Sequence, residues 1–277
     1  MPRSYKITLL IALYMAQGIP FGFFTLALPV LLREAGYSLT QISLLSFVAL
    51  PWVLKFLWAP VLDHTGTRRA WLLGFQLASI AGALLLTQAD PSDGLMVLIV
   101  AAFAFNVLAA SQDVITDGLA VRMLDTKERG LANAIQVGAY RFGMILGGGL
   151  LLSVFARTNW QVTFLCMAGL LTLTVLPTFL LKETTTATAA RYSAGELLIG
   201  WLRRLMQPGI LRFAVIIFLY RFGDQMVATL LGPFLIDQGM NKEAIALMKG
   251  TVGSATSLFG AIIGGWLAYS AGRRTAV

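Results

Sequence analysis

Seven ionisable side chains lie within long apolar stretches of this 277-residue sequence. They are Lys55, Asp113, Asp117, Arg141, Arg221, Asp224 and Lys249. A charge at the centre of a lipid bilayer costs about 2.5–3.5 kcal/mol on insertion scales, so such residues usually face a partner or a water-filled cavity. Cations in this position can bind anionic solutes, and carboxylates can bind amines or exchange protons. The pattern therefore predicts a passage for a solute.

The spacing of these residues brings some of them together on one helix face. Asp113 and Asp117 are four residues apart and Arg221 and Asp224 are three apart, so each pair shares a face. The three carboxylates are candidates for proton exchange. The predicted cavity lining consists of Tyr14, Gln17, Lys55, Gln112, Tyr140, Arg141 and Arg221.

Several of these residues also have a purely structural interpretation. Arg221 and Asp224 could be permanently paired and hold helices in register, whereas a carboxylate that changes partner could release and take up a proton. Lys249 lies about two turns from the outer surface, so its ammonium group could simply reach the headgroups. The glycines at 143 and 147–149 are expected to let another helix approach closely.

Eight apolar stretches can position these residues inside a bilayer, whose core of about 30 Å needs about 20 residues per helix. The first continues to Leu32 without a small-residue cleavage site, so we interpret it as a spanning helix and not as a signal peptide. The sequence therefore predicts an all-α, multi-pass membrane protein in a lipid bilayer. The stretches are 7–32, 41–62, 70–88, 95–119, 130–155, 160–181, 210–236 and 243–269.

The Lys and Arg residues outside these stretches lie mostly on one side of the predicted membrane. Fourteen of the 21 fall on the side of both termini, and only Arg33, Arg157 and Lys242 fall on the other. Cytoplasmic loops carry such an excess, so both termini are predicted to be cytoplasmic. The net charge of +8 then reflects membrane topology, and no nucleic-acid partner is expected.

The composition excludes most soluble and metal-dependent classes. Hydrophobic residues make up 57% of the chain and charged residues 12%, with a mean hydropathy of +0.77. Soluble domains typically have about 45–50% apolar residues and about 25% charged residues. One cysteine, Cys166, and one histidine, His64, provide neither an internal disulfide nor a His/Cys zinc cluster. With no nucleophile, nucleotide or metal motif visible, we expect no metal, no cofactor and no enzymatic activity.

The chain contains an internal repeat. Residues 59–69 and 265–274 are similar, with Gly66 aligned to Gly272. The first two stretches are thus repeated by the last two, which indicates two halves of six helices each. By this logic four helices are lacking, and the chain is expected to be a fragment or a truncated product. The predicted units are a six-helix half at 1–181, a cytoplasmic linker at 182–209 and an incomplete half at 210–277.

The linker contains an amphipathic segment. Ser193 and Glu196 have the spacing of a capping box that opens a helix, and Pro208 closes it. This pattern is typical of a helix that lies in the headgroup layer between two bundles, although an ordinary linker fits equally well. One face carries Leu197, Leu198, Trp201, Leu202 and Leu205, with Arg203 and Arg204 at its edge.

A charged loop follows the second stretch. Gly66 permits a tight turn, Arg68 and Arg69 would stay with the cytoplasmic headgroups, and Asp63 could bind neighbouring helix ends in one conformation only. The loop is therefore a candidate gate, or simply a charged loop that fixes the topology. The second copy carries Tyr269 in place of the acid.

Residues 63–69 resemble the loop motif between helices two and three of the major facilitator superfamily. Together with this loop, further segments look like the AmpG-type muropeptide permeases and, more loosely, the related acetyl-CoA transporters. The resemblance implies a truncated major facilitator fold, with a six-helix N-terminal bundle and the first two helices of the C-terminal bundle. The segments are 17–22, 55–63, 110–118, 140–144 and 219–224.

The resemblance also implies import of anhydromuropeptides, which are cell-wall sugars bearing short peptides, across the bacterial inner membrane with protons. Such substrates are anionic glycopeptides, and Lys55, Arg141 and Arg221 could supply a cationic lining for their carboxylates. The acids named above would then exchange protons or bind substrate amines. The alternatives are a carrier of acyl-CoA or another anionic solute, and a membrane remnant that does not transport.

Overall fold

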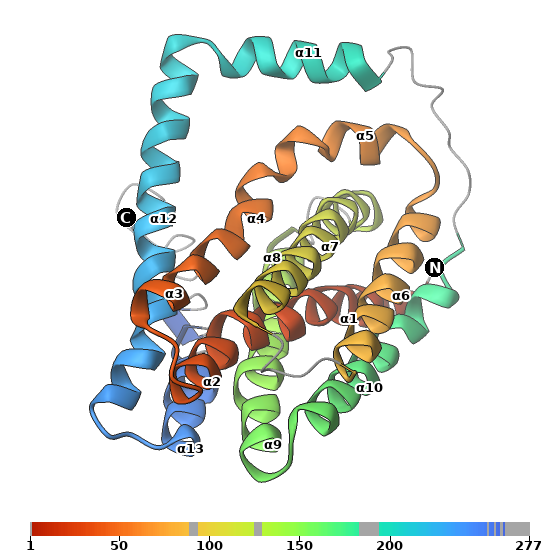
Figure 1. The fold of residues 1–277 in the computed structure, drawn as a ribbon. Helices are drawn as coiled ribbons and strands as arrows, with labels where there is room; N and C mark the ends of the chain where they lie inside the picture. The colour runs from red at the N-terminus through yellow and green to blue at the C-terminus, as the bar shows by residue number, and fades with distance from the viewer. Residues whose placement is uncertain are drawn as a thin grey trace.

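The computed structural model describes residues 2–88, 94–124, 129–182, 194–253, 255–257, 259–260 and 263. Every regular element in these ranges is helical (Figure 1). Seven of the helical segments are long and apolar enough to span a membrane, and they match the first seven predicted stretches. This confirms the prediction of an all-α, multi-pass membrane protein. The eighth stretch is described only in part, as α13 (Lys242–Ile245) and a π-helical segment at Ala246–Val252.

Of the first six spans, three are continuous α-helices and three are interrupted. The continuous ones are α6 (Arg68–Leu86), α7 (Leu95–Met123) and α10 (Trp160–Phe179). The first span consists of α1 (Arg3–Gly22), a π-helical segment at Phe23–Ala27 and α2 (Leu28–Glu34). The fifth span consists of α8 (Arg129–Met144), a π-helical segment at Ile145–Leu150 and α9 (Leu151–Arg157).

The second span departs most from the prediction of one continuous helix over 41–62. It is divided into α3 (Leu39–Ser43), α4 (Leu50–Leu54) and α5 (Ala59–His64), with 3₁₀ segments at Leu44–Ala49 and Lys55–Leu57. Pro51 and Pro60 each lie in the first turn of the helix that follows a break. Proline has no backbone N–H to donate, so it favours the start of a helix over its interior.

Successive spans run in opposite directions, which gathers the turns of the chain at two ends. At one end, the guanidinium of Arg69 donates to the carbonyl oxygen of Phe179 at 2.9 Å. At the other, the ring N–H of Trp160 donates to the carbonyl oxygen of Leu86 at 2.7 Å. We call these the Arg69 end and the Arg33 end, because Arg33 lies in the last turn of α2.

Glycines bring the first and fifth spans into close contact. A β-carbon at Gly143 would lie 2.6 Å from the carbonyl oxygen of Met15, and one at Gly147 would overlap the carbonyl oxygen of Ile19. Small residues let helix backbones approach in this way inside membranes. The structure thus identifies α1 as the helix that packs on the predicted glycine face.

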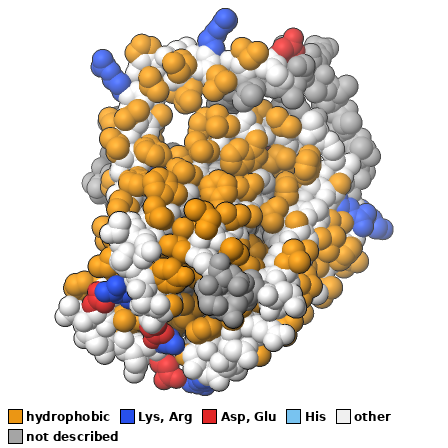
Figure 2. All heavy atoms as spheres, viewed as in Figure 1, with side chains coloured by type: hydrophobic (Ala, Val, Ile, Leu, Met, Phe, Trp, Pro, Cys, Tyr) orange, Lys and Arg blue, Asp and Glu red, His pale blue; other side chains and the backbone are white. Residues whose placement is uncertain are grey.

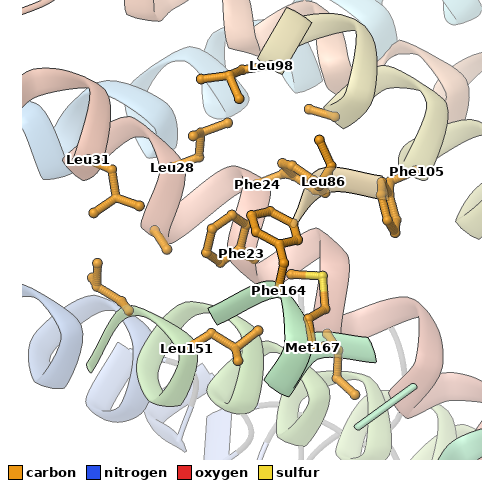
Figure 3. Close-up of a cluster of buried hydrophobic side chains, with 14 of the residues drawn as sticks. Phe23, Phe24, Leu28, Leu31, Leu86, Leu98, Phe105, Leu151, Phe164 and Met167 are labelled. Carbon is orange, nitrogen blue, oxygen red and sulfur yellow. The ribbon is translucent and has the colours of Figure 1, made fainter. Parts of the chain in front are cut away.

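Aromatic and aliphatic side chains fill the core nearer the Arg33 end (Figure 3). Phe23 packs against Phe24 and Phe164, with ring centroids 5.4 and 5.1 Å apart. These rings come from the first span and from α10, and Met167 lies beside them. Because the first span, which begins with α1, is enclosed on most sides, 72% of its apolar window is buried. It is the central helix on which the site depends.

The seventh span, α12 (Pro208–Asp237), stands at the edge of the molecule, and only 6% of its apolar window is buried. Before it, α11 (Ala194–Leu205) lies across the Arg69 end, and the chain turns a corner from α11 into α12 (Figure 1). Hydrophobic side chains cover the middle of the face seen in Figure 2, and charged side chains gather at its lower end, near α13. A long apolar surface of this kind suits a bilayer.

The linker prediction is only partly described by the structure. Residues 183–193, including the capping Ser193, lie outside the described residues, as do the side chains of Leu197, Leu198 and Trp201. The helix itself is present as α11, and its Arg203 and Arg204 side chains are exposed. The repeat's second loop, at 265–274, and the side chain of Lys249 also lie outside the described residues.

Candidate functional site

A buried ion pair joins the second and fourth spans. The Lys55 ammonium contacts a carboxylate oxygen of Asp113, and the Asp113 side chain is only 7% exposed. Lys55 follows α4 directly and also lies 5.5 Å from the centre of the Trp52 ring. The ammonium is therefore held by both a carboxylate and the negative face of an indole. Both charged residues were predicted from the sequence, but their pairing was not.

A second carboxylate, Asp117, lies one helical turn further along α7 and is bound by neutral groups. The Tyr14 hydroxyl donates to Asp117 Oδ1 at 2.8 Å, and the Gln136 amide donates to the same oxygen at 3.1 Å. Helices α1, α7 and α8 thus meet at one carboxylate oxygen. Gln136 was missed from the sequence, although it precedes Tyr140 by four residues and so shares its helix face.

Two of the predicted cavity residues lie between helices. Gln112 is 3% exposed and donates to the carbonyl oxygen of Leu13 at 3.0 Å. Gln17 is 1% exposed and donates to the Thr116 hydroxyl at 3.4 Å. These bonds join α1 to α7. Neither glutamine is among the residues that line the cavity described next.

A cavity of about 110 Å³ lies between the first, second, fifth and seventh spans. Of the residues predicted to line it, Tyr140 and Arg221 do so. Lys55 adjoins it through Trp52, one of its lining residues. The cavity is mostly apolar with a few polar groups, which is the usual character of a small-molecule site. Its lining is Phe21, Ser46, Ala49, Leu50, Trp52, Val53, Tyr140, Phe218, Arg221, Phe222 and Gln225.

Of Arg141, Arg221 and Asp224, only Arg221 lines this cavity. Arg221 pairs with Asp224 at 3.5 Å, but both side chains are largely exposed, at 62% and 59%. An ion pair this exposed contributes about 0–1 kcal/mol in water. Arg141 is half-buried and its guanidinium lies 3.5 Å from the Met144 sulfur. Neither Arg141 nor Asp224 is among the lining residues.

The charged loop at the Arg69 end forms a compact turn. Gly66 has a φ of +63°, which a side chain would disfavour, and Asp63 pairs with Arg68 at 3.7 Å. The pair lies against α7, where a β-carbon on Gly118 would be 3.5 Å from Asp63 Oδ1. Arg69 reaches α10, as described above. The loop therefore ties the second span to α7 and α10, and its role as a gate stays a prediction.

All three cations predicted for the outer side form ion pairs at the Arg33 end. These contacts join the first and fifth spans to α12 and α13. Arg33 binds Asp237 through two hydrogen bonds, of 2.8 and 2.9 Å, and this bidentate geometry is the most directional of the three. The pairs are Arg33–Asp237, Lys242–Glu34 at 2.5 Å and Arg157–Glu243 at 3.7 Å.

Known proteins are similar to this chain over most of its length. The family model for the Major Facilitator Superfamily matches residues 10–277. The chain is 29% identical to an uncharacterized protein of Haemophilus influenzae, over 91% of this chain and 62% of that protein. It is 29% identical to the Escherichia coli protein named anhydromuropeptide permease, over 96% of this chain and 55% of that one.

A Rickettsia felis protein named as a transporter, AmpG 4, is 26% identical over 98% of this chain and 69% of its own length. The chain therefore spans little more than half to about two thirds of the length of these relatives.

Proposed function

We propose that this chain, which belongs to the Major Facilitator Superfamily, moves anhydromuropeptides across the bacterial inner membrane together with protons. The superfamily consists of membrane transporters, so its match to residues 10–277 supports a transporter over an enzyme. The substrate follows from the likeness to the protein named anhydromuropeptide permease, and it is a proposal for this chain. The observation that carries the transport mechanism is the Lys55–Asp113 pair beside the cavity.

The pair supports coupling between an anionic solute and a proton. Its two charges neutralise each other only while they remain in contact, because Asp113 has little access to water. A substrate carboxylate that attracts Lys55 would leave Asp113 as an unpaired buried carboxylate, which is a costly state that protonation relieves. Substrate binding would then be linked to proton uptake at Asp113.

Asp117 offers a second position for the same proton. Its carboxylate lies one turn from Asp113 and is held by Tyr14 and Gln136 without a cation in contact among the described residues. Two carboxylates four residues apart on α7 repel each other when both are ionised. A proton on either acid relieves this repulsion, so the two acids are proposed to share one proton.

The orientation of the chain is also proposed from its charges. The three ion-paired cations of the Arg33 end are the same three that the charge bias assigned to the outer side. The Arg69 end carries the exposed cations Arg203 and Arg204 on α11. Cytoplasmic surfaces carry such an excess of basic residues. We therefore propose that both termini and α11 face the cytoplasm.

Uptake into membrane vesicles tests this function. Vesicles containing the chain receive labelled anhydromuropeptide with and without an imposed inward proton gradient. We expect uptake that the gradient increases, and loss of that increase in Asp113→Asn. The matched control is Glu243→Gln, since Glu243 is a largely exposed acid at the Arg33 end. No uptake under either condition, or equal uptake by Asp113→Asn, would contradict the proposal, and preference for an acyl-CoA competitor would redirect it to another anionic solute.

A further inference from the structure

Aromatic rings surround the cavity from four spans. The rings of Phe21, Trp52 and Tyr140 have centroids 5.6–5.9 Å apart and come from α1, α4 and α8. Phe218 and Phe222 of α12 add two stacked rings, 6.0 Å apart. We call these five rings the aromatic lining; all five lie among the cavity residues.

The position of the rings is fixed by contacts outside the cavity. The Trp52 ring N–H donates to Asn106 Oδ1 at 2.8 Å, so the polar edge of this ring is already satisfied. Two of the rings pack edge-on against it, which holds it in place. A ring held in this way loses little conformational freedom when it binds a ligand.

Polar groups of three kinds accompany the aromatic lining. Ser46 is 3% exposed, and its hydroxyl finds no hydrogen-bond partner among the residues that the structure describes. A buried polar atom without a partner costs free energy, so its position in a cavity lining points to a ligand that bonds it. Arg221 and Gln225 of α12 supply a guanidinium and an amide in the same lining.

We propose that the aromatic lining binds one face of a sugar ring of the substrate, an N-acetylated amino sugar. Sugar C–H bonds are weakly positive and pack against the negative faces of aromatic rings, while the hydroxyl and amide groups need hydrogen-bonding partners. Ser46 and Gln225 can form hydrogen bonds with the hydroxyl and amide groups, and Arg221 can bind a carboxylate attached to the sugar. This inference rests on the proposed function, because it assigns the sugar part of that substrate to a site.

The size of the cavity fits a single ring. An apolar cavity of about 150 Å³ takes up one benzene molecule, so a cavity of about 110 Å³ has room for one face of a six-membered ring and not for a whole disaccharide. The peptide part would then lie outside the aromatic lining. Lys55 adjoins this region through Trp52, so sugar and charge recognition would occur next to each other.

The aromatic lining differs from an aromatic surface that merely faces lipid. Phe213, for example, lies on the same helix as Phe222 but is 65% exposed and is not a lining residue. A lipid-facing ring needs no buried hydroxyl beside it. The unpartnered Ser46 hydroxyl among the lining rings is therefore the observation that separates the two interpretations.

Binding of a neutral sugar tests the inference. The full chain in lipid nanodiscs is titrated calorimetrically with N,N′-diacetylchitobiose, an uncharged disaccharide of N-acetylated amino sugars. We expect binding by the wild type, weakened about three- to tenfold in Phe222→Leu and in Ser46→Ala. Phe213→Leu and Ser43→Ala are the matched controls, because Ser43 is only half-buried and its hydroxyl already donates to the carbonyl oxygen of Thr40. Each variant must keep the thermal unfolding midpoint of the wild type.

The outcomes separate this inference from the proposed function. Absence of diacetylchitobiose binding by the wild type, or equal weakening in the two control variants, overturns the sugar site. The same samples are titrated with a complete anhydromuropeptide. Binding of the neutral sugar without binding of the anhydromuropeptide contradicts the proposed function and supports the sugar site. Unchanged anhydromuropeptide affinity in Phe222→Leu and Ser46→Ala contradicts the sugar site and leaves the transport proposal intact.

Discussion

Removing the Lys55 charge is expected to destabilise the chain, because it leaves Asp113 buried without its partner. Breaking a buried ion pair by removing one member costs about 3–5 kcal/mol. Lys55 is 30% exposed, so water already screens the pair in part, and the lower limit of about 3 kcal/mol applies. With an unfolding entropy of about 2.1 cal/mol/K per residue, this cost lowers the unfolding midpoint by about 5 °C.

Replacing both members should restore most of that stability. In Lys55→Met/Asp113→Leu no buried charge is left unpaired, and such replacements are often neutral or stabilising. The assay is thermal unfolding in lipid nanodiscs of the wild type, Lys55→Met, Asp113→Leu and the double variant. The double variant should unfold within about 2 °C of the wild type while failing to couple uptake to protons. Additive losses from the two single variants would refute the reasoning, since additivity means that the two side chains do not interact.

Other predictions concern packing, the Arg33 end and the second acid. Gly147→Ala should cost about 1–3 kcal/mol by forcing the first and fifth spans apart, whereas Gly169→Ala, which has open space on α10, should not; unfolding midpoints check this. Asp237→Arg should loosen α12 from α2, and Arg33→Asp added to it should restore the contact, measured by protease cleavage of α12. Asp117→Asn should keep the Tyr14 bond and the fold but lose proton-driven uptake in vesicles. Equal unfolding midpoints of the two glycine variants would contradict the first prediction. Unchanged protease cleavage after Arg33→Asp is added to Asp237→Arg would contradict the second, and full proton-driven uptake by Asp117→Asn would contradict the third.

Most of the spans could be predicted because length and hydropathy alone decide them. The first seven stretches appear in the structure with ends shifted by a few residues. The second stretch is the exception, since its apolar character continues through the breaks at Pro51 and Pro60. The prolines were visible in the sequence, but only the tertiary contacts decide whether a proline bends a span or divides it.

The candidate site was predicted only in its charges. Residue spacing finds partners on one helix, such as Arg221 and Asp224, whereas Lys55 and Asp113 come from different spans and their pairing depends on how the spans pack. Phe222 was missed for another reason. An aromatic residue in an apolar helix has the same sequence signal whether it faces lipid, core or cavity. Ser46 was missed likewise, because only the structure shows that its hydroxyl is buried without a partner.

The central claim is that a water-accessible passage runs between the spans at the cavity. Labelling with a charged, water-soluble thiol reagent tests it most directly, with single cysteines in place of Tyr140 and Arg221 and with Cys166→Ser as background. Leu173→Cys is the control, because Leu173 is 64% exposed on the apolar surface of α10. We expect both cavity positions to react from one compartment, and we expect anhydromuropeptide to slow the reaction. Labelling no faster than at position 173, from either side of the membrane, would contradict it.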